Sequence, residues 1–117
     1  MALKITVRQL DGVPVLSLDG SIGVGAEANS LRDQVKTLLA DGAKKIVLNM
    51  SRVTLLDSAG LGTLVGLHQS AHSCAASLRL CNLAPQVKEL LQLTRLLTVF
   101  NVSPTEADAV RSLSQTP

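Results

Sequence analysis

The most informative stretch of the chain reads Asp57-Ser58-Ala59-Gly60-Leu61-Gly62. Asp and Ser are among the preferred N-cap residues, so Asp57 or Ser58 is suited to cap the first turn of a helix. The residues that follow form an apolar face at helical spacing, made of Leu61, Leu64, Val65, His68 and Ala71. The stretch therefore predicts a strand that passes through a short turn into a helix.

The pattern before this stretch predicts a hairpin, a loop, a helix and a central strand. Asp11-Gly12 suits the tight turn of a two-residue hairpin, which makes the strands on either side antiparallel. Residues 20–25 are expected to form a loop because they are rich in glycine. The other expected elements are strand 3–8, strand 13–18, helix 31–39 and strand 44–49, the last with the apolar run of a central strand.

The pattern after this stretch predicts two further strands, each followed by a helix. Strand 78–83 leads to a helix that begins at Pro85, and strand 99–102 leads to a final helix. Ser103-Pro104-Thr105-Glu106 combines a cap, a proline and a capping-box acid at the start of that helix, and residues 113–117 are expected to fray. The order implies an α/β fold, with a mixed sheet of about five strands and about four helices packed against it.

Size and composition indicate one globular domain and disfavour nucleic acid as a partner. The chain has 117 residues, 46% of them hydrophobic, and a formal net charge of +2. Phe100 is its single aromatic residue, so it offers no platform on which bases could stack. The basic residues are scattered, and only Lys44 and Lys45 adjoin, so no dense phosphate-binding stripe is present.

The sequence also favours a cytoplasmic protein that does not insert into a membrane. Its start alternates apolar and polar residues, whereas a secretory signal needs a continuous apolar stretch. Residues 58–78 carry no formal charge, but serines, a glutamine and two histidines interrupt them, so a buried helix is the better interpretation. Cys74 and Cys81, without an export signal, suggest reduced thiols.

Ser58 occupies a position where a phosphate would be well accommodated. Unpaired amides and the positive end of the helix dipole favour an anion there, and a phosphoserine carries about −1.5 to −2 charges. Gly60 and Gly62 leave the first turn nearly bare, so that a partner's backbone could approach, while Leu61 can anchor the helix inward. The simpler alternative is that Ser58 is only an N-cap.

Residues 57–62 resemble the D-S-S/A-G-L-G signature of STAS domains, in particular bacterial anti-sigma factor antagonists. The likeness extends over nearly all of residues 1–117 as a single domain. Besides the initial hairpin, it rests on Ile46-Val47-Leu48-Asn49-Met50-Ser51, on Leu80-Cys81-Asn82, and on the helix from Pro85 to Leu96. The resemblance implies a non-enzymatic signalling protein of transcription regulation, without a cofactor, and a monomer or weak dimer.

The resemblance also implies a partner and a set of site residues. In that family the serine of the motif is phosphorylated by an anti-sigma factor that is also a serine kinase, and a serine phosphatase reverses this. Ser58 matches that position. The implied partner-binding residues are Asp57, Ala59, Gly60, Leu61, Gly62, Ser21 and Asn49. The chain departs from the family at Gly23 and Asn49, where acids are common, and at Arg95, where glycine is common.

Other interpretations remain open. The same fold could serve as an unphosphorylated scaffold subunit of a signalling or lipid-transport complex. Gly23-Val24-Gly25-Ala26-Glu27-Ala28 satisfies G-x-G-x-x-A, which would make the loop at 20–25 a nucleotide or small-ligand site. The preceding hairpin and the neutral Asn49 argue against a dinucleotide.

Metal binding and covalent catalysis are disfavoured. His68, His72, Cys74 and Cys81 could suggest zinc, but their spacing is incomplete. A hydrolase would need a base beside Ser58, and both histidines lie too far along the helix.

Overall fold

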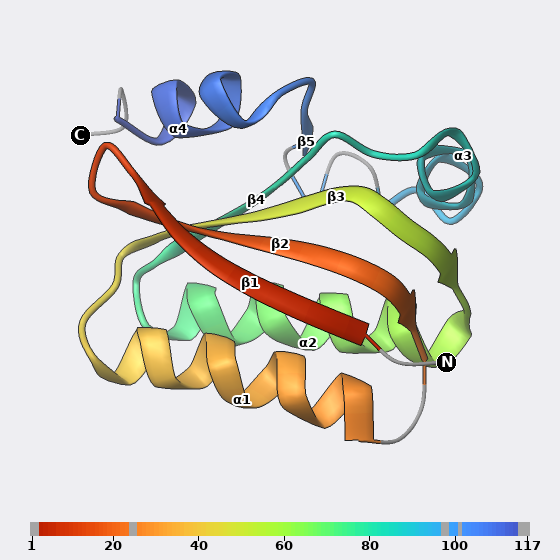
Figure 1. Ribbon diagram of the computed structural model, residues 1–117, viewed down its shortest axis with the longest axis horizontal. Coiled ribbons are helices and arrows are strands. Elements are labelled where there is room, and N and C mark those ends of the chain that lie inside the picture. The colour runs from red at the N-terminus through yellow and green to blue at the C-terminus, as the bar shows by residue number, and fades with distance from the viewer. Residues whose placement is uncertain (1–2, 24–25, 97–98, 101, 115–117) are drawn as a thin grey trace.

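The computed structural model describes residues 3–23, 26–96, 99–100 and 102–114. Over these residues the chain forms five strands and four helices in the expected order. They are β1 (Leu3–Leu10), β2 (Val13–Ile22), α1 (Ala26–Ala40), β3 (Lys45–Leu56), α2 (Ser58–Ser73), β4 (Ser77–Cys81), α3 (Pro85–Leu93), β5 (Val102–Ser103) and α4 (Glu106–Ser114). Figure 1 shows α1 and α2 side by side under one face of the sheet and α4 over the other. We call these the α1/α2 face and the α4 face.

The sheet is mixed, as the sequence predicts, with strand order β1-β2-β3-β4-β5. β1 and β2 form the antiparallel hairpin, and the remaining neighbours are parallel. Asp11 and Gly12 have φ angles of 52° and 79°, which are the positive values that a two-residue hairpin turn requires. β3 is the central strand of the sheet, as expected.

Three strands are longer than the sequence indicates, β1 by two residues and β2 and β3 by more. β2 continues to Ile22, so the expected loop at residues 20–25 is wrong for residues 20–22, while Val24 and Gly25 lie outside the described residues. β3 continues seven residues past Asn49 to Leu56, with no separate turn before Asp57. Two register shifts between β2 and β3 allow this extension, because they return Val53 and Leu56 to the α1/α2 face after an exposed polar stretch.

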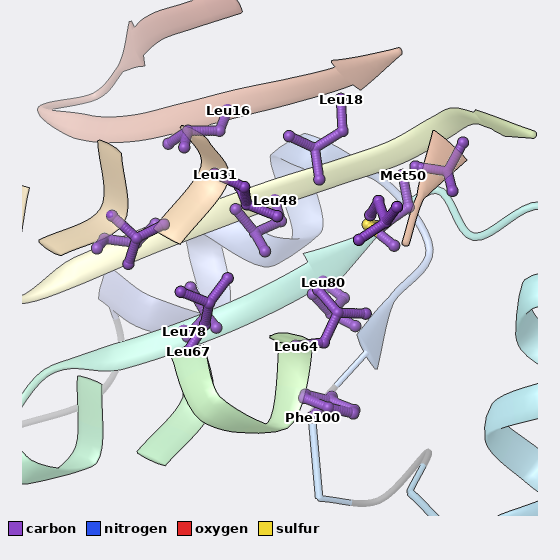
Figure 2. Packing of buried hydrophobic residues seen from close by; sticks show 14 of the residues in the cluster. Leu16, Leu18, Leu31, Leu48, Met50, Leu64, Leu67, Leu78, Leu80 and Phe100 are labelled. Carbon is purple, nitrogen blue, oxygen red and sulfur yellow. The ribbon is translucent and has the colours of Figure 1, made fainter. Parts of the chain in front are cut away.

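The two faces of the sheet bury two separate clusters. The α1/α2 face carries the main core, in which leucines from β2, β3 and β4 meet Leu64 and Leu67 of α2, with Phe100 at its end (Figure 2). The α4 face carries a smaller cluster, formed by Val13, Val15, Val47, Cys81, Ala109, Val110 and Leu113. α4 is therefore attached to the sheet independently of the main core.

The start and end of α4 differ from the sequence-based expectation. Thr105, and not Ser103, caps the helix, because the Thr105 hydroxyl accepts a hydrogen bond of 3.1 Å from the amide of Asp108. Ser103 belongs to β5. Leu113, expected to fray, lies within α4 and is 1% exposed, because it packs against the α4 face.

Helices α1, α2 and α3 end in the same hydrogen-bonding pattern. In each, a residue with positive φ follows the cap: Gly42 (95°), Ala75 (56°) and Arg95 (61°). The next amide donates to a carbonyl five residues back: Ala43 to Leu38 at 3.0 Å, Ala76 to Ala71 at 2.8 Å, and Leu96 to Leu91 at 2.9 Å. This is the Schellman motif, which favours glycine at the positive-φ position. Only α1 has the favoured residue there.

Candidate functional site

Ser58 is the first residue of α2, it is exposed, and it is not the helix cap. Asp57 fills that role, because its Oδ1 accepts a hydrogen bond of 2.8 Å from the amide of Gly60. Its backbone carbonyl accepts the first helical bond, from the amide of Leu61 at 2.8 Å. Among the described residues, the Ser58 hydroxyl makes no hydrogen bond. The simpler interpretation of Ser58 as a cap is therefore wrong, and its hydroxyl is available to a partner.

The surroundings of Ser58 are polar on one side and apolar on the other. The first turn of α2 contains no acidic residue, so its free amides keep a positive potential, which the capping carboxylate of Asp57 partly offsets. Leu55, three residues before Ser58, is 55% exposed although it is a large apolar side chain. The sequence analysis missed Leu55, because the expected strand ended before it.

Gly60 and Gly62 have different roles. Gly60 is buried, and a Cβ there would lie 2.7 Å from the carbonyl carbon of Ile22 and 2.8 Å from Cδ1 of Leu56. Gly60 therefore lets α2 pack directly on β2, and the expectation that it leaves the surface bare for a partner is wrong. A Cβ on Gly62 would have no heavy atom within 4 Å, so Gly62 does form bare surface. Leu61 is half-buried against the main core, which fits its expected anchoring role.

The end of β2 and the residue that follows it reach the site. Ser21 pairs with Leu55, so it lies beside the end of β3, three residues before Ser58. A Cβ on Gly23 would lie 2.9 Å from Oδ2 of Asp57. The glycine thus gives the capping carboxylate the room that a side chain would occupy.

Asn49 does not belong to the site, so its predicted place at the rim is wrong. It lies within β3, seven residues before the strand ends, and its side chain is on the α4 face. Its Nδ2 donates to Oε2 of Glu106 at 2.6 Å, and its Oδ1 accepts from the amide of Ser51 at 2.9 Å. Asn49 therefore holds α4, and its neutral side chain has no direct bearing on the charge around Ser58.

Asn49 is part of a polar cluster that sequence analysis did not find. Arg8 of β1 donates to Glu106 of α4 and, at 3.2 Å, to the hydroxyl of Ser17. Cys81 is buried beneath, and burial, assisted by the Glu106 carboxylate and opposed by Arg8, raises the pKa of its thiol to about 12. Arg8 and Glu106 are 98 positions apart, so no local pattern in the sequence indicates the contact.

The zinc interpretation finds no support in the geometry. The ring of His68 stacks edge-on against Phe100, with centroids 5.8 Å apart. Cys74 is exposed, whereas Cys81 is buried beneath α4. Within the part of the chain that the structure describes, no three His, Cys, Asp or Glu side chains form a group that could hold a metal ion.

For the dinucleotide interpretation, the strand arrangement is more favourable than expected, but the charge beside the glycine motif is unfavourable. β2 and β3 are parallel, so the objection that the hairpin spoils the parallel arrangement is wrong. The Asp57 carboxylate, however, lies against Gly23, at the beginning of the glycine motif. A carboxylate there opposes a pyrophosphate.

Among the described residues, no helix is long and apolar enough to cross a membrane.

Comparisons with known proteins agree on one family. A family model described as the STAS domain matches residues 4–109. BtrV of Bordetella bronchiseptica, whose name marks it as a candidate anti-sigma factor antagonist, is 27% identical over 101 residues, or 86% of each chain. The structure of an anti-sigma factor antagonist from Mycobacterium paratuberculosis has a TM-score of 0.83 at 24% identity, over 97% of this chain and 96% of that one. Unphosphorylated SpoIIAA, also an anti-sigma factor antagonist, has a TM-score of 0.79 at 20% identity, over 97% and 99%. These two structures share the fold of this chain.

Proposed function

This chain belongs to the STAS domain family, and on that basis we propose that it is an anti-sigma factor antagonist switched by phosphorylation of Ser58. Its unphosphorylated form binds an anti-sigma factor that is also a serine kinase, and so releases a sigma factor. Phosphorylation of Ser58 ends this binding, and a serine phosphatase restores it. The chain acts by protein–protein contact in the bacterial cytoplasm, without catalysis of its own.

The observation that carries the proposal is the free hydroxyl of Ser58 at an exposed helix start. Because Asp57 caps the helix, modification of Ser58 removes no bond that the fold needs. A phosphate at the first turn of a helix is also favoured by the dipole and the free amides. The fold can therefore carry both forms of the residue, as a reversible switch requires.

The switch works through desolvation and charge. In the unphosphorylated form the partner meets a small surface made of Ser58, Ala59 and Gly62, with the apolar Leu55 beside it. Phosphorylation adds about −1.5 to −2 charges to this surface, next to the carboxylate of Asp57. Burying that charge without a matched cation costs several kcal/mol, on the order of the binding free energy of a transient complex.

The test uses ATP and each candidate kinase of the anti-sigma type from the same organism. We expect one phosphoryl group per chain, located on Ser58 by peptide mass spectrometry, and none on the Ser58→Ala variant. Ser58→Asp should bind the anti-sigma factor at least about tenfold more weakly than the parent chain, a change of about 1.4 kcal/mol.

Ser73→Asp is the matched control for this test. Ser73 is an exposed serine at the other end of α2, about 22 Å from Ser58 along the helix axis. It receives the same change in charge and should bind like the parent chain. If no kinase modifies Ser58, and Ser58→Asp binds as tightly as Ser73→Asp, the proposed switch is wrong.

One observation favours a second candidate function, that of an unphosphorylated scaffold subunit. Gly23 stands where the family often has an acid, so among the described residues the carboxylate at this position is that of Asp57, which lies against Gly23. A kinase that recognises the acid would then bind this chain less well. Affinity purification would separate the two functions, because a scaffold should return transporter or signalling subunits and no kinase.

A further inference from the structure

β1 has a long and regular outer edge that no described strand pairs with. It contains eight residues and no proline, and its pairing with β2 is uninterrupted from Leu3 to Leu10. Edge strands usually discourage further pairing by being short, bulged, interrupted by proline or charged, and β1 has the last of these features alone, in Lys4 and Arg8. Here the register shifts of the sheet occur between β2 and β3, and β1 keeps its full pairing capacity.

The hairpin determines which residues of β1 offer their backbone to this edge. Leu10 and Val13 flank the two-residue turn, so their backbone groups bond to each other. Backbone groups alternate in direction along a strand, so the even-numbered residues of β1 bond to β2. The amides and carbonyls of Ile5, Val7 and Gln9 therefore point outward, away from the sheet.

The side chains beside this edge are mainly apolar on the α1/α2 face, where Leu3, Ile5 and Val7 lie together with Gln9. Val7 is 45% exposed, and it borders a mainly apolar hollow of about 300 Å³ that is also lined by Asp33, Gln34, Thr37 and Leu38 of α1. The charged residues of β1, Lys4 and Arg8, lie on the opposite face, where Arg8 is bound to Glu106. An added strand would thus place an apolar side chain beside Val7, over the hollow.

We propose that the outer edge of β1 pairs with the same edge of a second copy, in antiparallel fashion about a two-fold axis at Val7. The two sheets then become one continuous sheet. Val7 exchanges both backbone hydrogen bonds with Val7 of the second copy, and Ile5 does so with Gln9 of the second copy. This inference does not depend on the proposed function of Ser58.

The charged side chains of β1, Lys4 and Arg8, favour this pairing register over the registers one or two residues away. With Val7 on the axis, Lys4 faces Leu10 of the second copy and Arg8 faces Thr6 of the second copy, so no like charges are directly opposed. The two copies of Arg8 are diagonal neighbours, and each is paired with a Glu106 carboxylate. An axis at Thr6 would oppose Lys4 to Arg8, and one at Arg8 would oppose two arginines. An axis at Ile5 avoids both conflicts but shortens the paired region. Only the axis at Val7 combines a long pairing with compatible charges.

The test measures molecular mass in solution by light scattering over a range of protein concentrations. We expect the mass to approach twice that of one chain as the concentration rises. Val7→Lys and Val7→Glu should each weaken the dimer at least about tenfold, because each opposes two like charges at the axis. An equimolar mixture of these two variants should restore the dimer, since Lys then faces Glu. Val7→Thr, which keeps the β-branched shape, is the matched control and should still dimerise.

Hydrogen exchange supplies a second readout within the same strand. On dimerisation the amides of Ile5, Val7 and Gln9 should become protected, while those of Thr6 and Arg8, which already bond to β2, should not change. A chain that stays monomeric at all concentrations would overturn the proposal. So would a dimer that forms without protecting the outward amides, or one that neither charged variant weakens.

Discussion

Alanine substitutions at Gly60 and Gly62 should change stability in opposite directions, although both residues lie in the first turns of α2. At residue 60 the new Cβ would collide with the carbonyl oxygen of Ile22 and lie 2.7 Å from its carbonyl carbon. Carbon atoms pack best at about 3.5–4.0 Å, so α2 and β2 must separate by about 1 Å. Because the obstacle is backbone, the strain should reach the upper part of the usual range for overpacking, about 3 kcal/mol.

The gain in helix propensity acts on both variants. Replacing glycine by alanine inside a helix contributes about 1 kcal/mol, which leaves Gly60→Ala destabilised by about 2 kcal/mol. Gly62→Ala meets no heavy atom within 4 Å, so it should keep the whole gain of about 1 kcal/mol. The two variants should therefore differ by about 3 kcal/mol for the same chemical change.

Urea denaturation followed by circular dichroism measures this difference in the free energy of unfolding directly, and thermal melting gives the corresponding shifts in Tm. With a shift in Tm of about 4 °C for each kcal/mol in a domain of this size, Gly62→Ala should melt about 4 °C higher and Gly60→Ala about 8 °C lower. Equal shifts for the two variants would show that α2 does not rest on β2 through Gly60. Gly62→Ala has a functional use as well, since a loss of partner binding without a loss of stability would identify Gly62 as contact surface.

Ala75→Gly and Arg95→Gly should each raise the free energy of unfolding by about 1 kcal/mol, because both residues hold a positive φ that glycine adopts without strain; thermal melting checks this. Burial and the Glu106 carboxylate raise the pKa of the Cys81 thiol from 9.0 to about 12. The protonated, buried thiol therefore contributes its full stability below pH 9, and this contribution is lost as the pH rises toward 12. Stability should therefore fall by about 1 kcal/mol per pH unit above pH 9, and Cys81→Ala should fall less steeply in urea titrations at each pH. Asp57→Ala should cost about 1 kcal/mol by removing the cap of α2, and an unchanged Tm would contradict that role.

The sequence predicted the elements whose signals are local. Asp11-Gly12 indicated the hairpin, and the apolar spacing after Gly60 indicated α2, because each depends on a few neighbouring residues. The motif at residues 57–62 also placed Ser58 at a helix start, as the structure confirms. It did not show whether Asp57 or Ser58 is the cap, since both residue types are suitable.

The misplaced features depend on contacts between distant segments. β3 was expected to end at Asn49 because the apolar run stops there, but register shifts against β2 extend it to Leu56. Asn49 was then placed at the rim of the site, whereas its amide binds Glu106. Gly60 resembled open surface because its contact with Ile22 comes from another element. Such contacts leave no periodic trace in a single sequence.

The pairing of Arg8 with Glu106 has a consequence for how the protein is made. These residues are 98 positions apart, which a ribosome covers in about 5–20 s at 5–20 residues per second. During that interval β2 and β3 can already form, yet Val13, Val15 and Val47 have no α4 to cover them. The nascent chain therefore carries an open apolar face until translation delivers α4, and that interval is when a chaperone has most to protect.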